Sequence, residues 1–197
     1  MQASNPLPYE VSGDKNSKNL VVFIHGFPDC MELWDNITPE VSKDAYVLNV
    51  SYPNIHPSQK TKWGVSFEEL GARLKQTIDQ VNDTKRAVTV VGHDWGAYVT
   101  YCFDKQFPGY AKQLITLDVP YKPKQSIFFV LYTYVLCVAF ILGCCCGNFL
   151  TRLVLKVFKY NPPYAKKINY RWNFFYFQLW KSLVQSKFNP KKMFLYG

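Results

Sequence analysis

The sequence lacks acidic residues after Asp118. All 14 Asp and Glu residues lie in the first 118 positions, beside 11 Lys and Arg, whereas the last 79 positions carry 12 Lys and Arg. The formal charge therefore changes from −3 to +12 along the chain, and the basic part also holds 20 of the 34 aromatic residues. With 48% hydrophobic and 19% charged residues, the composition excludes an intrinsically disordered chain. One chain of 197 residues thus combines two stretches of different physical character.

Regularly spaced cysteines and metal-binding motifs are also missing. The six cysteines include the run Cys144–Cys146, whose adjacent thiols cannot pair without strain, and no Cys or His cluster has zinc-site spacing. We therefore expect no bound metal and no cofactor. The first eight residues lack the basic-then-apolar layout of a secretory leader, which favours an intracellular, reducing setting. No recognised nucleic-acid-binding motif accompanies the basic half, so no nucleic-acid partner is expected.

Short apolar runs alternate with helical periodicity in the first part of the chain. The runs at 21–24, 46–50, 87–91 and 114–117 predict strands, and the segments 66–81 and 97–107 predict helices. Ser66 is a suitable N-cap for the first of these helices. Strands that alternate with helices indicate an α/β fold with a mostly parallel sheet.

The reactive group that we predict is a carboxylate at the end of the strand 87–91, in the segment Gly-His-Asp-Trp-Gly. The small residues Gly92 and Gly96 allow a sharp turn that exposes Asp94 at the N-terminus of a helix, where a negative charge is stabilised. A carboxylate in this position can attack an electrophilic carbon and form an ester. The alternative interpretation is that Asp94 only caps the helix.

A second motif, His-Gly-Phe-Pro, ends the first strand at positions 25–28. The backbone N–H groups of Phe27 and Trp95 are predicted to form an oxyanion hole. Other residues of the two motifs are expected to shape the site without reacting: His25, Gly26, Pro28, Gly92, His93 and Gly96.

These two motifs, together with Trp34, resemble the α/β-hydrolase fold in its epoxide hydrolase and haloalkane dehalogenase branch. The resemblance implies that Asp94 forms an alkyl-enzyme ester, which a His-activated water then hydrolyses. It implies a small apolar electrophilic substrate, an epoxide or similar. Phe27 favours the epoxide hydrolase over the haloalkane dehalogenase alternative. The segment 51–57 departs from the family, which often has a Gly-rich loop there.

The resemblance also implies a division of the chain. Residues 1–118 correspond to the N-terminal part of the hydrolase core, 119–190 to an inserted helical cap, and 191–197 to the start of the next core strand. In the cap, Tyr132 and Tyr170 are expected to donate hydrogen bonds to the substrate oxygen, because a phenol is a neutral donor. Tyr176 is the rival of Tyr170 for this role.

The family supplies a His base and its relay acid after the cap, but the histidines here are His25, His56 and His93, all before it. The resemblance therefore implies a C-terminally incomplete hydrolase, with the last core strands and helices missing, that does not complete turnover on its own. The alternative is a non-catalytic, membrane-associated protein on a truncated hydrolase fold.

The segment Ile127–Gly147 is 21 residues long with only Thr133 clearly polar, which is sufficient to cross a bilayer as a helix. The cations around it predict contact with an anionic membrane surface. We favour an interfacial or buried cap helix over a transmembrane helix. The run Cys144–Cys146 is expected to fill space as small apolar residues, with palmitoylation as the alternative.

Overall fold

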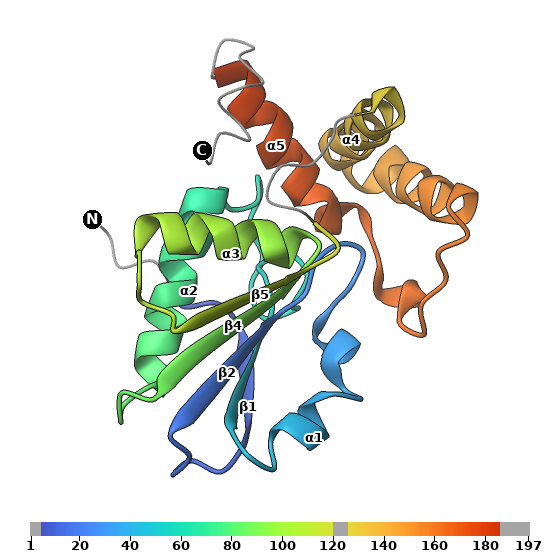
Figure 1. The fold of residues 1–197 in the computed structure, drawn as a ribbon. Coiled ribbons are helices and arrows are strands. Elements are labelled where there is room, and N and C mark those ends of the chain that lie inside the picture. Colours follow the sequence, from blue (N-terminus) through green and yellow to red (C-terminus); the bar gives the residue numbers. More distant parts are fainter. Residues whose placement is uncertain (1–4, 120–125, 186–197) are drawn as a thin grey trace. The chain divides into compact units, whose positions relative to one another are not determined.

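The computed structural model describes residues 5–119 and 126–185 (Figure 1). It consists of two units, the first formed by residues 1–59 and 66–120, and the second by residues 60–65 and 121–197. The segment 191–197, predicted to begin another strand, lies outside the described residues.

The first unit contains a five-stranded sheet of order β1-β3-β2-β4-β5. Its strands are β1 (Tyr9–Gly13), β2 (Asn19–Ile24), β3 (Tyr46–Val50), β4 (Ala87–His93) and β5 (Gln113–Leu117). All neighbouring strands are parallel except β1, which runs antiparallel to β3 at one edge. The predicted α/β fold with a mostly parallel sheet is therefore confirmed.

Helices lie on both faces of this sheet (Figure 1). The helices α2 (Phe67–Val81) and α3 (Trp95–Gln106) cover one face, while the 3₁₀ helix η1 (Met31–Trp34) and the short α1 (Thr38–Val41) lie toward the other. Both longer helices were predicted, and Ser66 accepts a hydrogen bond from the backbone N–H of Glu69 as the N-cap of α2.

The core follows from the alternation of side chains along the strands. Leu20, Val22 and Ile24 of β2 are fully buried on the face covered by α2 and α3. On the opposite face, Phe23 stacks on Trp34 of η1 with ring centroids 4.7 Å apart. The parallel pairing of β2 with β4 places their carboxyl ends side by side, which is where both motifs lie.

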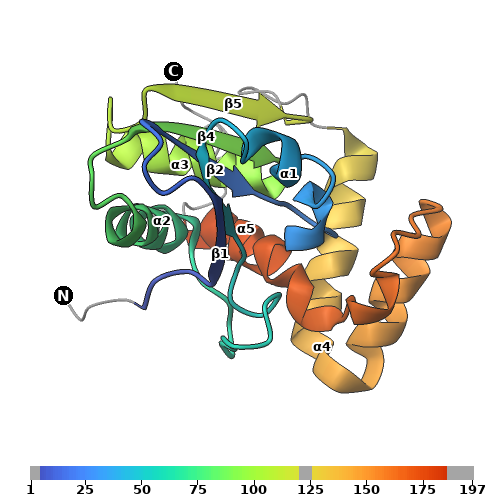
Figure 2. The ribbon, with the colours of Figure 1, turned by 90° about the horizontal axis from the view of Figure 1, so that it is seen from below.

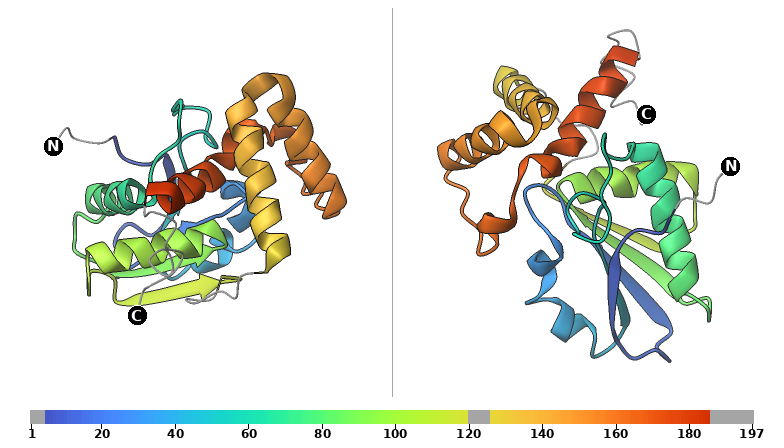
Figure 3. Two further views of the ribbon diagram at one scale, coloured as in Figure 1. Left: turned by 90° about the horizontal axis from the view of Figure 1, so that it is seen from above. Right: turned by 180° about the vertical axis from the view of Figure 1, so that it is seen from behind.

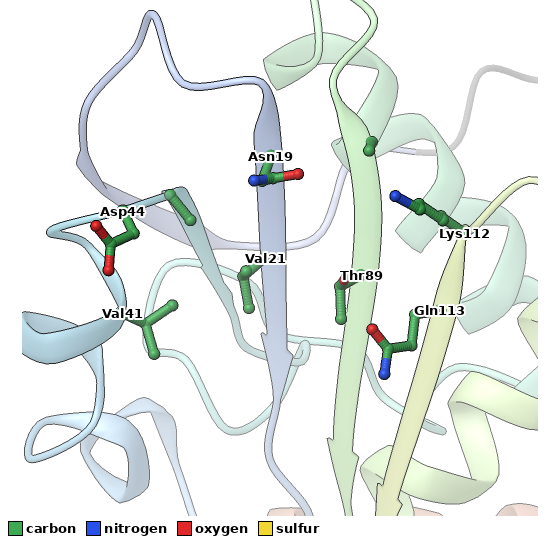
Figure 4. A pocket seen from close by; sticks show the side chains of 9 residues that line it. Asn19, Val21, Val41, Asp44, Thr89, Lys112 and Gln113 are labelled. Carbon is green, nitrogen blue, oxygen red and sulfur yellow. The ribbon is translucent and has the colours of Figure 1, made fainter.

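A cavity of about 450 Å³ opens on the η1 face of the sheet (Figure 4). It is lined near the starts of the strands, by Asn19 on β2 and Gln113 on β5 among others, with Asp44 and Lys112 as its charged residues. The cavity therefore lies at the opposite end of the strands from the two motifs.

The second unit is helical in the part that the structure describes. It contains α4 (Ile127–Val157), the 3₁₀ helices η2 (Ala165–Lys167) and η3 (Tyr170–Asn173), and α5 (Phe174–Gln185). The segment 60–65 joins this unit, because Gln178 donates a hydrogen bond to the carbonyl oxygen of Trp63 at 2.7 Å. Buried aromatic residues of η3 and α5, among them Trp172, Phe174 and Phe175, form much of its core.

The predicted apolar segment is helical, but it does not form one continuous helix. Gly143 has φ 69° and ψ −146°, which interrupts α4 and divides it into arms at 127–142 and 144–157. The two arms fold back on each other (Figures 2 and 3). At their contact, a Cβ atom on Gly147 would lie only 2.1 Å from the carbonyl oxygen of Ala139. A glycine at 147 therefore allows the close approach of the two arms.

Candidate active site

The first feature of the site is a strained turn between β4 and α3. Asp94 has φ 51° and ψ −119°, a conformation that non-glycine residues rarely adopt. Its backbone N–H donates to the carbonyl oxygen of Leu117 at the end of β5, and its own carbonyl oxygen accepts from Ala97 in α3. The turn is therefore held from both sides, as the predicted elbow requires.

Two glycines allow the elbow and the 25–28 loop to approach each other. A Cβ atom on Gly96 would lie 2.3 Å from the carbonyl oxygen of Ile24, and one on Gly26 would lie 2.6 Å from Cβ of Asp94. Because neither position has room for a side chain, the backbone of the loop reaches the carboxylate itself.

The contact between loop and carboxylate is a hydrogen bond. The backbone N–H of Phe27 donates to Oδ2 of Asp94 at 2.9 Å. The backbone N–H of Trp95 also hydrogen-bonds this carboxylate. The structure thus brings together the three residues that the sequence predicted as nucleophile and oxyanion donors. Asp94 occupies the N-cap position of α3, and apart from the hydrogen bond from the Trp95 N–H its side chain makes no capping hydrogen bond to that helix.

The electrostatic environment of Asp94 combines opposing effects. Burial raises the pKa of its carboxyl group, whereas the hydrogen bonds from Phe27 and Trp95 and the charge of His93 lower it. The net shift is upward from the ordinary value of 3.8. A carboxylate that is partly desolvated but held by fixed donors is a better nucleophile than one in water.

His25 is buried beneath the loop. Its Nδ1–H donates to the carbonyl oxygen of Gly26 at 3.0 Å, and its Nε2 lies 3.2 Å from the hydroxyl of Ser51. Burial lowers the pKa of this imidazole to about 4, so it is neutral at pH 7. Its hydrogen bonds join the loop to the end of β3, a contact that supports the structural role expected for it.

His93 forms an ion cluster that the sequence analysis missed. Its Nε2 lies 2.6 Å from Oδ2 of Asp118, and its Nδ1 lies 3.4 Å from Oδ2 of the buried Asp29. The carboxylates of Asp29 and Asp118 raise the pKa of His93 to about 9 against the effect of burial, so the imidazole is charged at pH 7. The contact arises from the sheet, because β4 and β5 pair with His93 opposite Leu117, which places Asp118 beside it.

The third histidine lies in the loop after β3. Nδ1 of His56 is 2.7 Å from the hydroxyl of Ser58, and this loop also includes the bridge between Pro53 and His56. The departure from the family pattern at 51–57 is thus an ordered loop.

In the second unit, Tyr132 of α4 pairs with Tyr176 of α5. Their hydroxyl oxygens are 2.8 Å apart and their rings meet edge to face. Tyr170 lies in η3, where its backbone N–H donates to Asn148 and its ring faces the guanidinium of Arg171. Among the cap tyrosines considered from sequence, the structure therefore brings together Tyr132 and Tyr176.

Within residues 5–119 and 126–185, no group of three His, Cys, Asp or Glu side chains is arranged to hold a metal ion. At the elbow, the described residues place a carboxylate against backbone N–H donors.

Comparison with protein families gives a match to the family described as alpha/beta hydrolase fold, over residues 19–131. Epoxide hydrolase 1 of Caenorhabditis elegans is 28% identical over 112 residues, which are 56% of this chain and 27% of that protein. AB hydrolase superfamily protein YfhM of Bacillus subtilis (strain 168) is 30% identical over 105 residues, 52% of this chain and 36% of that protein. The matched segment spans about a third of the length of these relatives.

Solved structures show the same fold. Epoxide hydrolase CorEH has a TM-score of 0.60 at 17% identity, covering 94% of this chain and 65% of that chain. A thermophilic esterase from Thermogutta terrifontis has a TM-score of 0.64 at 18% identity, covering 82% of this chain and 59% of that chain.

Proposed function

This chain belongs to the alpha/beta hydrolase fold family, and we propose that it carries the ester-forming machinery of an epoxide hydrolase, with Asp94 as the nucleophile. The observation that carries the proposal is the hydrogen bond from the Phe27 N–H to Oδ2 of Asp94, made at a strained elbow. A carboxylate that only capped a helix would have no need of a donor from the separate loop at 25–28.

In the proposed step, Oδ1 of Asp94 attacks a ring carbon of the epoxide. A C–O bond to the enzyme forms, the ring C–O bond breaks, and its electron pair moves to the epoxide oxygen. Oδ2 becomes the carbonyl oxygen of the ester and stays against the Phe27 N–H. When water later adds to this ester, negative charge develops on Oδ2, where the N–H groups of Phe27 and Trp95 stabilise it.

The leaving oxygen needs a proton donor. We assign this role to a tyrosine of the second unit, with Tyr132 and Tyr176 as the candidates, whose hydroxyl groups hydrogen-bond each other at 2.8 Å. Within the second unit, the pairing with Tyr132 supports Tyr176, the rival named from the sequence, over Tyr170. A pair of phenols suits an alkoxide better than a halide, which supports epoxides over haloalkanes as the substrate class.

Hydrolysis of the ester needs a general base. His25 is buried and bonded at both nitrogens, His93 is charged at pH 7, and His56 is bonded to Ser58. We therefore assign the ester-forming step to this chain and leave the second step without a base among its own histidines.

The test is covalent labelling. The chain is incubated with an aryl epoxide and, separately, with a haloalkane, then digested and analysed by mass spectrometry. We expect an adduct on Asp94 from the epoxide, lost in Asp94→Asn and retained in Asp104→Asn, a matched change in α3. An adduct from the haloalkane alone would favour the dehalogenase alternative. No adduct from a folded chain would favour the non-catalytic one.

A further inference from the structure

The hairpin formed by the two arms of α4 exposes large apolar side chains. In the first arm, Ile127, Phe128 and Leu131 are exposed, with 79% of Phe128 accessible. In the second arm, Phe149, Leu153 and Val157 are exposed at intervals of four residues, so they form a stripe along one side of the helix. Exposed apolar surface of this extent marks an interaction site in a soluble unit.

The bend between the arms carries three more exposed residues of low polarity. Cys144, Cys145 and Cys146 directly follow Gly143, and all three are exposed. Exposed thiols do not fill space inside the unit, so the expectation that they act as small apolar filling residues is wrong. Cys30, Cys102 and Cys137, by contrast, are buried.

The charge of the second unit indicates what covers this surface. Residues 60–65 and 121–197 carry 14 Lys and Arg and no Asp or Glu, whereas the first unit carries 9 Lys and Arg and all 14 acids. Arg152 and Lys156 are exposed on the second arm, among the residues of the apolar stripe. Long cationic side chains beside apolar residues match the boundary between acyl chains and anionic headgroups. A second copy of this unit would meet the same surface with a charge of the same sign.

The bend at Gly143 also determines whether α4 lies on a bilayer or crosses it. By length and composition α4 is the one helix, among the residues that the structure describes, that could span a membrane. Its arms contain 16 and 14 residues, or about 24 and 21 Å, whereas the hydrocarbon core is about 30 Å thick. Neither arm is therefore long enough to cross.

We propose that the second unit binds the surface of anionic lipid bilayers through the α4 hairpin, with the apolar stripe and the bend in the acyl-chain boundary and the cations at the headgroups. This property is independent of the reaction proposed for Asp94, and a chain without any labelling activity is expected to show it.

The first test is flotation of the chain with vesicles of phosphatidylcholine alone or with added phosphatidylserine. We expect binding to the anionic vesicles and release as salt is raised, because salt screens the cationic contacts. Equal binding to both vesicles, or binding that resists high salt and alkaline washing, would overturn the interfacial proposal in favour of a spanning helix. Absence of binding to either would overturn it outright.

Variants separate the contributions of the cations and of the apolar side chains to membrane binding. Arg152→Gln with Lys156→Gln is expected to weaken partitioning about 25-fold, at about fivefold per cation, whereas Lys18→Gln with Lys112→Gln in the first unit should leave it unchanged. Phe149→Ser with Leu153→Ser should also reduce binding, and Val11→Ser with Ile37→Ser, at similarly exposed positions of the first unit, should not. Because these side chains are exposed, the variants are expected to fold, which thermal denaturation checks.

The native cysteines report the position of the bend. A charged maleimide should label Cys144, Cys145 and Cys146 in the free chain, with the three buried thiols as the internal control. Anionic vesicles are expected to protect the exposed thiols from labelling. Vesicles of phosphatidylcholine alone are expected to give no protection. Unchanged labelling on bound chain would show that the hairpin is not the contact. Protection without vesicles at high protein concentration would instead indicate self-association.

Discussion

Asp94 holds a backbone conformation that suits glycine better than aspartate. We expect Asp94→Gly to be more stable than Asp94→Ala by about 1 kcal/mol, because both lose the carboxylate but only glycine relieves the strain. Urea denaturation of the two variants measures this difference. Equal stability of the two variants would show that the φ of 51° is not strained. The backbone conformation would then no longer support a nucleophile elbow at Asp94.

The charged state of His93 predicts a stability change with pH. Its folded pKa of about 9 lies above the unfolded value of 6.5, so its contribution is complete below pH 6.5 and is lost as pH rises through 9. Because Asp118 is largely exposed and screened by solvent, we expect a loss of about 1 kcal/mol. The measurement is the free energy of unfolding at pH 6 and pH 10.

The matched variants for this prediction are His93→Gln and Asp83→Asn. The first should flatten the change between pH 6 and pH 10. The second removes an exposed carboxylate whose pKa is lowered by Arg86, so its contribution changes only in acid and the slope in this range should stay as in the parent chain. A parent chain as stable at pH 10 as at pH 6 would contradict the cluster.

Contacts that depend on short sequence motifs could be predicted from the sequence. Asp94 and the N–H groups of Phe27 and Trp95 follow from turn patterns a few residues long. The pairing of His93 with Asp118 was not predicted, because it depends on which strands are neighbours.

At the scale of elements, Gly143 determines the hairpin. We expect Gly143→Ala to destabilise the second unit by about 1–3 kcal/mol, because φ 69° with ψ −146° is accessible to glycine almost alone. A Cβ atom at this position would meet nothing within 4 Å, so any effect reports strain and not a clash. Thermal denaturation followed by circular dichroism measures it. An unchanged melting temperature would mean that the bend is not fixed by this residue.

Elements with strong local signals were predicted and those decided by packing were not. The strand 46–50 and the helix capped by Ser66 carry their pattern in their own residues. The edge strand β1 has only exposed or half-exposed residues, so it lacks the alternation that marks a half-buried strand. The bend at Gly143 lies in an apolar run that a straight helix would also satisfy, and the close contact of Gly147 with Ala139 is tertiary.

At the scale of the whole chain, the three histidines of these 197 residues predict labelling without turnover. A positioned base typically contributes about 10²–10⁴-fold in rate, and each of the three histidines is engaged elsewhere. We therefore expect close to one covalent label per chain and no further product. The measurement compares product released with label incorporated. Sustained turnover that Asp94→Asn abolishes would identify one of the three histidines as a base, and turnover rising above pH 9 would point to His93.

The hydrogen bond between Phe27 and Asp94 has a consequence for inhibition. In an elbow with a serine nucleophile, the N–H donors are open before the substrate binds, so a free anion can occupy them. Here the nucleophile itself already accepts the hydrogen bonds of both donors. A boronate or a small carboxylate would have to displace a group that is tethered to the backbone. We therefore expect boronates and small carboxylates to leave the labelling of Asp94 unaffected. A dose series of each compound measures this directly. Protection by low concentrations of boronate would show that the donors are open. Neutral ligands that mimic the epoxide oxygen, and reagents that alkylate the carboxylate, are the compounds that this arrangement admits.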